Sequence, residues 1–233
     1  MKIYVIGSRP GAELPDAAPD HVYVAQSALP LAQRYKGKCP ITAVMGGPLF
    51  CSSRTRSEST RLRLKGCYAD RMLITYGNQY APDLHPEDIG IRVDEVIWVS
   101  IREKSMRALR TIGVQRLLRA SMRFLGPLSI IDLARRYLTG VYPHKLLRIS
   151  SGGFAVYWAL EESQPDVEIQ IYGIGLRGGV GHYFDVDRKY PDGHVFADSL
   201  LFESIASKPR GRDVWSDDLD VNIALARDMS QVI

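Results

Sequence analysis

The sequence has 233 residues, of which 45% are hydrophobic and 24% are charged, and its formal net charge is +4. This length suits one domain with its own core, spanning residues 1–233, and argues against two. Three cysteines without a CxxC spacing are unlike a disulfide framework or a cysteine zinc site, and no apolar run approaches the ~20 residues of a membrane span. We therefore expect a soluble, cytoplasmic protein with reduced thiols, whose mildly basic surface favours anionic ligands.

The predicted elements alternate between strands and helices along the chain. Short apolar runs predict strands at Lys2–Ile6, His21–Ala25, Ile41–Met45, Arg71–Tyr76 and Glu95–Ser100, then helices at Lys104–Phe124, Ser129–Leu138 and Phe154–Leu160, a strand at Ile169–Tyr172 and a helix at Asp198–Ala206. The strand runs are continuous instead of alternating, which is typical of parallel strands covered on both sides. The sequence thus predicts an α/β fold: a Rossmann-like, doubly wound, mostly parallel sheet with helices on both faces.

Two predicted strands end in glycine-containing turns that suit a ligand. The first strand is followed by Gly7 and Ser8, and the strand at Ile169–Tyr172 is followed by Gly173 and Gly175. Ligands of doubly wound sheets bind beyond the carboxyl ends of the strands, where glycine lets them approach the backbone. A plain tight turn, or a loop that needs positive φ, is the alternative explanation of the same glycines.

The third candidate is the run Ser150, Ser151, Gly152 and Gly153, directly before a predicted helix. Small residues at a helix start leave N–H groups free at the positive end of the helix dipole, where anions bind. An ordinary N-cap is the commoner reason for serine at this place. Taken alone, the run favours the cap.

Two histidines, His182 and His194, follow the strand at Ile169–Tyr172. A histidine titrates near neutral pH and is the usual general base for a sugar hydroxyl. The pair could instead bind a metal with Asp185 or Asp198, although the spacing matches no helical metal motif. A structural role for one of the two histidines stays open.

Four segments between Leu147 and Ala206 resemble, in order and spacing, the C-terminal motifs of the animal-type sialyltransferases. They read SSGGFAVYWAL, IQIYGIG, GHYFD and HVFADSLLFE, against the family's small sialylmotif, the strand after it, its His-Tyr motif and its later histidine upstream of a glutamate. The large sialylmotif would align with KIYVIGSRPG and HVYVAQSA, with Ser8 and Gln26 in place of two asparagines that contact the nucleotide. The family's disulfide between the two motifs has no counterpart, which fits a divergent, bacterial-type member.

The resemblance implies a fold and an activity. It implies a sialyltransferase-like glycosyltransferase that passes sialic acid or Kdo, with inversion, from a CMP-sugar to a hydroxyl group of a glycan, lipid-linked or other acceptor. No metal and no cofactor besides this donor is required. The residues that would bind the donor nucleotide are Gly7, Ser8, Gln26, Ser150, Ser151, Gly152, Gly173, Gly175 and Tyr183. His182 would stabilise charge on the departing phosphate, and His194 would remove the acceptor proton.

Residues 101–148 carry nine arginines and two lysines against two acidic residues, with apolar residues interleaved. Such a segment can lie on an anionic membrane surface, which would place the protein against the inner face of the membrane, or bind a polyanionic acceptor. A solvated helix face whose arginine stems cover apolar surface explains it equally well. Nucleic acid is not the expected partner, because no recognised motif for it is present.

Two other functions stay open at this stage. One is a metal-dependent pyrophosphokinase or hydrolase that uses a nucleotide on a similar fold. The other is a non-enzymatic protein that binds anions or nucleic acid through residues 101–148. Sensitivity to a chelator would favour the first, and a steep salt dependence of oligonucleotide binding would favour the second.

Overall fold

The computed structural model describes residues 1–54, 57–77, 82–125, 131, 148–176, 194–207 and 214–225. Seven strands in these ranges form one sheet in the order β5-β4-β3-β2-β1-β6-β7, and all neighbouring strands are parallel. The strands are β1 (Lys2–Ile6), β2 (His21–Ala25), β3 (Ile41–Gly46), β4 (Tyr68–Tyr76), β5 (Arg92–Ser100), β6 (Glu168–Tyr172) and β7 (Val214–Ser216). The predicted α/β, Rossmann-like class is thereby confirmed.

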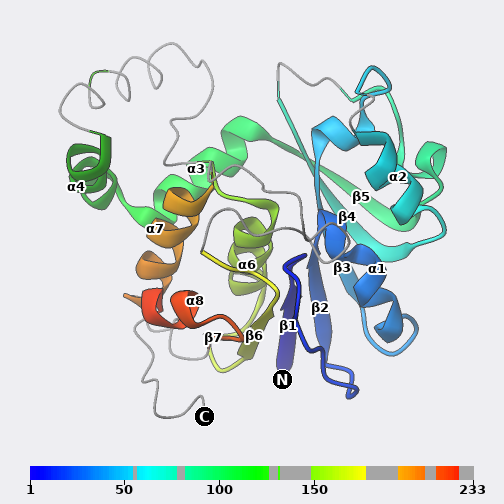
Figure 1. Cartoon of the computed structure of the whole chain (residues 1–233), viewed down its shortest axis with the longest axis horizontal. Helices are drawn as coiled ribbons and strands as arrows, with labels where there is room; N and C mark the ends of the chain where they lie inside the picture. Colours follow the sequence, from blue (N-terminus) through cyan, green and yellow to red (C-terminus); the bar gives the residue numbers. More distant parts are fainter. Residues whose placement is uncertain are drawn as a thin grey trace.

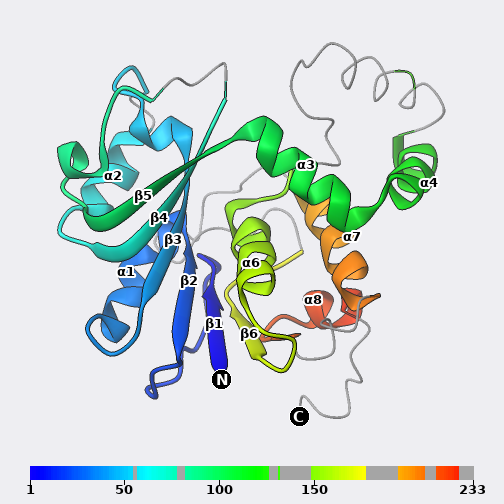
Figure 2. The ribbon, with the colours of Figure 1, turned by 180° about the vertical axis from the view of Figure 1, so that it is seen from behind.

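Helices lie on both sides of the sheet (Figure 2). They are α1 (Leu29–Ala32), α2 (Glu58–Leu64), α3 (Ile101–Ile112), α4 (Val114–Leu125), α6 (Ser151–Glu162), α7 (Val195–Ala206) and α8 (Leu219–Ala224), with short 3-10 helices at Gln26–Ala28, Gln33–Tyr35, Gly47–Phe50 and Pro86–Ile89. α6 packs on β1, β2 and β3, and α1 and α2 lie on the opposite side. α3 begins directly after β5 and runs across to α7 (Figure 1).

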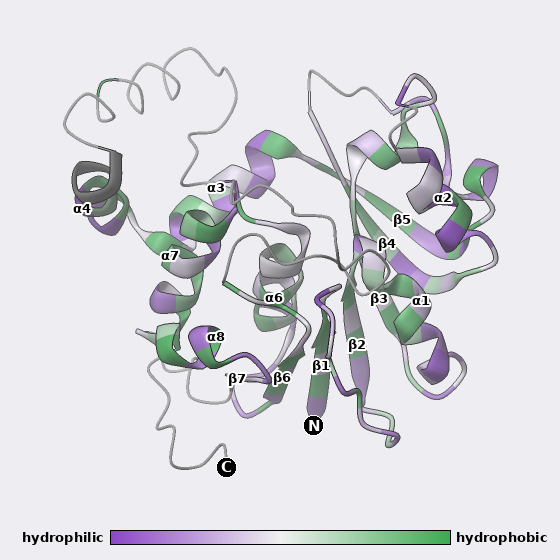
Figure 3. Cartoon of the chain, in the orientation of Figure 1, coloured by the Kyte–Doolittle hydropathy of each residue, from purple (hydrophilic) through white to green (hydrophobic). Residues whose placement is uncertain are grey.

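The central strands β1, β2 and β3 are buried on both faces, which explains their continuous apolar runs, whereas most of β5, at one edge of the sheet, is exposed or only partly buried. In β1, Ile3 and Val5 belong to one buried cluster with residues of α6 and α7, whereas Tyr4 and Ile6 belong to another with residues of α1 and α2. Hydrophobic residues accordingly run through the strands in Figure 3. The three cysteines form no disulfide.

Several elements differ from the prediction. The sequence predicts one helix over Lys104–Phe124, but α3 ends at Ile112 and α4 begins at Val114. Gly113 between them takes φ +81°, a conformation that glycine adopts easily and that ends a helix. β7 was not predicted, because three residues are too few for an apolar run to stand out. The helix predicted at Ser129–Leu138 lies outside the described residues, apart from position 131.

No helix in the described ranges is long and apolar enough to cross a bilayer.

The strand order places the ends of β1 and β6 side by side where the chain changes direction. From β1 the chain adds β2 to β5 outward on one side, and β6 and β7 then pair on the other side of β1. In doubly wound sheets the loops leaving two such strands separate, and ligands bind between them at the carboxyl ends. The residues that follow β1, β2 and β6 are therefore the first candidates for a binding site.

Candidate functional site

Five predicted site residues lie together at the carboxyl edge of the sheet. Gly7 and Ser8 follow β1, Gln26 follows β2, and Gly173 and Gly175 follow β6, and these three strands are neighbours. We refer to these five residues as the strand-end group. The structure brings them together because parallel strands all present their carboxyl ends at one edge.

Gly7 and Gly173 let two chain segments touch. The Gly7 N–H donates to the carbonyl of Tyr172 at 2.7 Å, and the Arg9 N–H donates to the carbonyl of Gly173 at 2.9 Å. A methyl group on Gly7 would overlap the carbonyl oxygen of Gly173, and Gly173 itself takes φ +63°. Packing of the chain on itself thus requires both glycines, whether or not a ligand binds beside them.

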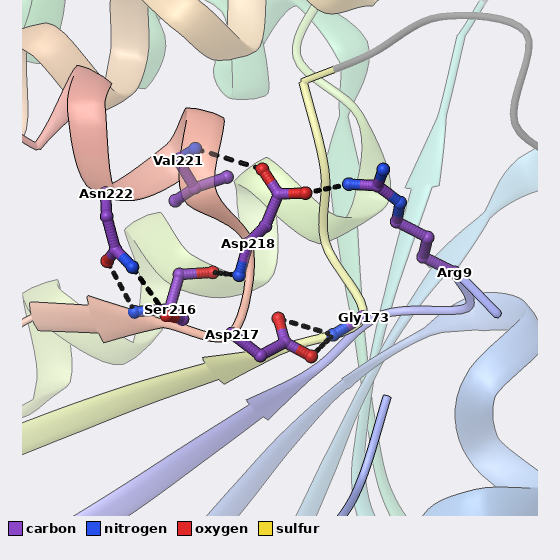
Figure 4. Close-up of polar contacts among 7 residues, drawn as sticks. All are labelled: Arg9, Gly173, Ser216, Asp217, Asp218, Val221 and Asn222. Carbon is purple, nitrogen blue, oxygen red and sulfur yellow. Dashed lines mark hydrogen bonds and ion pairs between the residues drawn. The ribbon is translucent and has the colours of Figure 1, made fainter. Parts of the chain in front are cut away.

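Two acidic residues after β7 bond Gly173 and its neighbour Arg9 (Figure 4). The two carboxylate oxygens of Asp217 accept from the Gly173 N–H at 2.9 and 3.2 Å, and Asp218 forms an ion pair with Arg9. Burial raises the pKa of Asp217, and the Gly173 N–H and Arg9 oppose this rise. The Arg9 guanidinium fills the space over Gly175, where a methyl group would overlap it. The protein's own side chains therefore occupy part of this edge.

Gln26 also makes a bond within the protein. Its Oε1 accepts a hydrogen bond from the Gly46 N–H at 2.9 Å, which links the end of β2 to the end of β3. Its Nε2 finds no acceptor among the described residues. That amide N–H₂ group is the part of Gln26 that could reach a ribose or a base.

The start of α6 combines a cap with unused donors. The hydroxyl oxygen of Ser150, the N-cap, accepts from the Gly153 N–H at 2.9 Å, and the Ser150 carbonyl accepts from the Phe154 N–H at 3.0 Å. The described part of the chain offers no acceptor to the N–H groups of Ser151 and Gly152. N–H groups at these first helical positions project from the positive end of the helix dipole. Ser150 is therefore a cap, and two donors remain that an anion could use.

His194 lies beside this helix start. It is exposed, it immediately precedes α7, and its Nδ1 lies 2.6 Å from the carbonyl oxygen of Arg148. Because a carbonyl oxygen only accepts hydrogen bonds, Nδ1 carries the proton. In the neutral ring the lone pair is then on Nε2, which is the tautomer that a general base needs.

A buried carboxylate joins the two helices. Asp198, in the first turn of α7 and only 5% exposed, accepts from the Ser150 N–H at 2.9 Å. Burial raises the pKa of Asp198, while hydrogen bonds from Ser150 and the charges of His194 and Lys104 oppose this rise. Lys104 of α3 packs its ammonium over the ring of Phe154, 5.0 Å from the centroid. Desolvation lowers the pKa of Lys104 to about 8, against the opposing charge of Asp198.

These residues form a second group, the helix-start group: Lys104, Ser150, Ser151, Gly152, His194 and Asp198. The side chain of Ile174 lies between this group and the strand-end group. Ile174 is buried; its side chain would lie 3.1 Å from a methyl group on Gly152 and 2.5 Å from one on Gly7. Residues predicted from three distant parts of the sequence are therefore adjacent.

Two predicted site residues, His182 and Tyr183, lie outside the described residues. Their roles at the departing phosphate stay predictions. Glu203, the glutamate that follows His194 in the sequence, is not the acid that contacts α6; its carbonyl oxygen accepts a hydrogen bond from Arg116. The acid at the helix start is Asp198, one turn after His194.

Sequence reasoning missed Lys104 as a site residue, although a signal for it exists. Lys104 lies four and eight residues before the buried Ala108 and Ile112 of α3, so its stem shares their face. Asp217 and Asp218 carry no comparable signal, because they follow a strand too short to recognise.

In the described part of residues 101–148, some arginines pack against other side chains instead of only facing solvent. Arg107 stacks over the ring of Trp158, 4.6 Å from the centroid, and pairs with Glu103. Arg116 donates from Nη1 to the hydroxyl of Ser204 at 2.9 Å, which fastens α4 to the last turn of α7. Arginines that cover apolar surface are thus present, and the contact of residues 101–148 with a membrane stays a prediction.

Comparisons of the chain with protein-family models, with curated proteins and with solved structures found no match. Its function therefore has to be argued from the geometry of the two groups.

Proposed function

We propose that the chain is a sialyltransferase-like glycosyltransferase that transfers an acidic sugar, sialic acid or Kdo, from a CMP-sugar to a hydroxyl group. One observation carries this proposal: His194, exposed and held in the base tautomer, lies beside two N–H groups at the start of α6 that find no acceptor among the described residues. Transfer from a nucleotide-sugar needs both features, because the departing phosphate requires an anion site and the acceptor hydroxyl requires a base.

The sequence resemblance and the geometry support each other. The segments that resemble the sialylmotifs contribute Gly7, Gly152, Gly173 and His194, which are far apart along the chain. In the fold they lie around Ile174 and the start of α6, at the edge where doubly wound sheets bind their ligands. The strand ends share this edge in any parallel sheet, so the position of His194 beside the start of α6 is the part of this geometry that supports the proposal.

In the proposed reaction the N–H groups of Ser151 and Gly152 bind the phosphate of the CMP-sugar. Nε2 of His194 takes the proton of the acceptor hydroxyl while its oxygen bonds to the anomeric carbon. The bond from that carbon to the phosphate oxygen breaks, and CMP leaves with the electron pair. Attack from the side opposite the leaving group inverts the anomeric configuration, through an oxocarbenium-like transition state. The proton on His194 then passes to water.

The test compares His194→Ala with a matched control. His85→Ala removes another exposed histidine, which precedes the 3-10 helix Pro86–Ile89 and contacts Trp98 of β5, at the far edge of the sheet. Calorimetry should give both variants the wild-type affinity for CMP. Turnover of CMP-sialic acid or CMP-Kdo should fall roughly 100-fold or more in His194→Ala and stay near wild type in His85→Ala.

Three results would contradict the proposal. The first is a thermal-shift screen of CMP, CDP, UDP, ADP and GDP in which CMP does not raise the melting temperature of the wild-type protein. The second is a His194→Ala variant with wild-type turnover. The third is turnover abolished by a chelator, which would favour the metal-dependent pyrophosphokinase or hydrolase instead.

A further inference from the structure

The buried Asp198 carboxylate ties the start of α6 to α7 by a hydrogen bond. It bonds the Ser150 N–H at 2.9 Å, and its own N–H donates to the carbonyl of His194 at 2.9 Å. A methyl group on Gly153 would lie 2.5 Å from Oδ1 of Asp198, so the second glycine of the SSGG run makes room for this carboxylate. The position of His194 relative to α6 therefore depends on Asp198.

A carboxylate at this place creates an electrostatic problem. It is 5% exposed, and a buried charge is costly unless another charge and hydrogen bonds compensate it. It also brings negative charge to the positive end of the α6 dipole, where the proposed reaction needs to bind a phosphate. An uncompensated Asp198 would weaken that end for any second anion.

Lys104 supplies the compensating charge from a third helix. Its ammonium lies 5.0 Å from the centroid of the Phe154 ring, in the first turn of α6, and its charge acts on Asp198. α3 carries it there from the end of β5, at the opposite edge of the sheet. The first turn of α6 contains no acidic residue that could compete for this ammonium.

We infer that Lys104 is a positioning residue of the proposed transferase: its ammonium balances the Asp198 carboxylate and so keeps His194 fixed against an α6 start that can still accept a phosphate. The inference rests on the proposed function. In this role Lys104 does not contact the substrate; it acts through Asp198.

The experiment is a four-protein cycle of the full chain: wild type, K104M, D198N and K104M/D198N. The readouts are kcat and KM with the CMP-sugar that the wild type uses, the Kd for CMP, and the melting temperature. K104M leaves the carboxylate unbalanced, so we expect kcat to fall at least about tenfold. The double variant removes the negative charge, and asparagine can still accept a hydrogen bond from the Ser150 N–H. We therefore expect K104M/D198N to turn over faster than K104M alone. R102M, which removes an exposed cation of the same helix, should match the wild type.

A pH profile adds a readout that loss of structure would not imitate. In the wild type kcat should fall above pH about 8, where Lys104 loses its proton, and this fall should be absent in D198N. Asp198 is the charged group that acts on Lys104, and His194, the residue before α7, acts on Asp198. Glu103, next to Lys104, is paired with Arg107.

The outcomes separate the inference from the function on which it rests. A wild type that binds no CMP and turns over no CMP-sugar overturns both. If the wild type is active, either of two results overturns the inference alone. One is a kcat of K104M within about twofold of the wild-type kcat. The other is a double variant in which the losses of kcat from the two single variants multiply, because independent effects, such as a direct contact of Lys104 with the substrate, would give that result. If K104M fails to fold, folding and turnover regained in K104M/D198N support the inference, and their absence overturns it.

Discussion

The strand-end group contains glycines at chain turns and the helix-start group contains Gly152 in the first turn of α6, yet the N–H groups of the two groups have different partners. At the strand ends, the Gly7 N–H donates to Tyr172 and the Gly173 N–H donates to Asp217, so the protein itself uses both donors. At the helix start, the described residues leave the N–H groups of Ser151 and Gly152 without an acceptor. A glycine therefore indicates that another group approaches the backbone closely. Only the hydrogen-bond partners of the N–H groups show whether that group belongs to the protein or could belong to a ligand.

The difference suggests that the two groups at the carboxyl edge have different roles, one in stability and one in the reaction. Close packing of β1 against β6 fixes the strand ends and offers few free donors. The helix start combines free donors, a base and a compensated charge, and so contains the chemistry that transfer requires. If this division is right, substitutions at the strand ends should cost stability first, whereas substitutions at the helix start should cost binding or turnover first.

The largest expected effect is on stability, from Gly7→Ala. The added methyl group would overlap the backbone oxygen of Gly173, which can move only if β1 and β6 separate. We expect a loss of about 3 kcal/mol in the free energy of unfolding, measured by urea denaturation. Gly66→Ala is the control, because its φ is +85° but nothing lies within 4 Å of the new methyl group. A Gly7→Ala variant no less stable than this control would show that the strand ends are not tightly packed.

The next effect is on binding, from Ser151→Pro. Proline is tolerated at the first helical position, and Ser150 already has φ −64° and ψ 171°, which suit a residue before proline. The variant therefore removes one N–H donor with little change in stability. We expect the Kd for CMP to rise roughly tenfold or more, because a hydrogen bond to a charged group is worth about 1.5–3 kcal/mol.

Ser151→Ala is the matched control for this variant, since it removes the hydroxyl and keeps the N–H. Equal CMP affinities in Ser151→Pro and Ser151→Ala, measured by calorimetry, would mean that the N–H of residue 151 does not bind the phosphate. The difference between the two groups would then lose its functional meaning.

The fold was largely predictable, because apolar runs and glycine turns are local signals. Six of the strands stand out in the sequence as short apolar runs, although β5 is largely exposed in the fold, whereas β7 is too short, and Gly113 breaks a helix that periodicity alone would continue. Of the site, the sequence predicts the helix start and His194. It could not predict that Asp198 occupies one donor of α6, or that Lys104 reaches it from the far edge of the sheet, because these contacts join three helices through the tertiary fold.

A smaller effect on stability is expected from Gly175→Ala. Its new methyl group would meet the end of a flexible side chain, the Arg9 guanidinium, instead of backbone. Arg9 can swing away at the cost of its ion pair with Asp218, so we expect a loss of about 1 kcal/mol in the free energy of unfolding. The same substitution in an Arg9→Ala background should be nearly neutral; an undiminished loss there would point to a backbone cause.

The last expected effect, on the pH dependence of stability, separates the two groups by its sign. The pKa of Lys104 falls to about 8 from the ordinary 10.5, so between these values the unfolded chain binds a proton that the folded chain has released. The free energy of unfolding of the wild type, relative to Lys104→Met, should therefore rise as the pH increases from about 8 to 10.5. The pKa of Asp217 is raised above 3.8, so there the folded chain holds the extra proton, and stability relative to Asp217→Asn should fall as the pH increases through its folded pKa. Urea titrations of the three proteins across both ranges measure the two slopes. An alkaline slope shared by wild type and Lys104→Met would mean that Lys104 is solvated like a surface lysine, and the charge balance at the helix start would lose its physical basis.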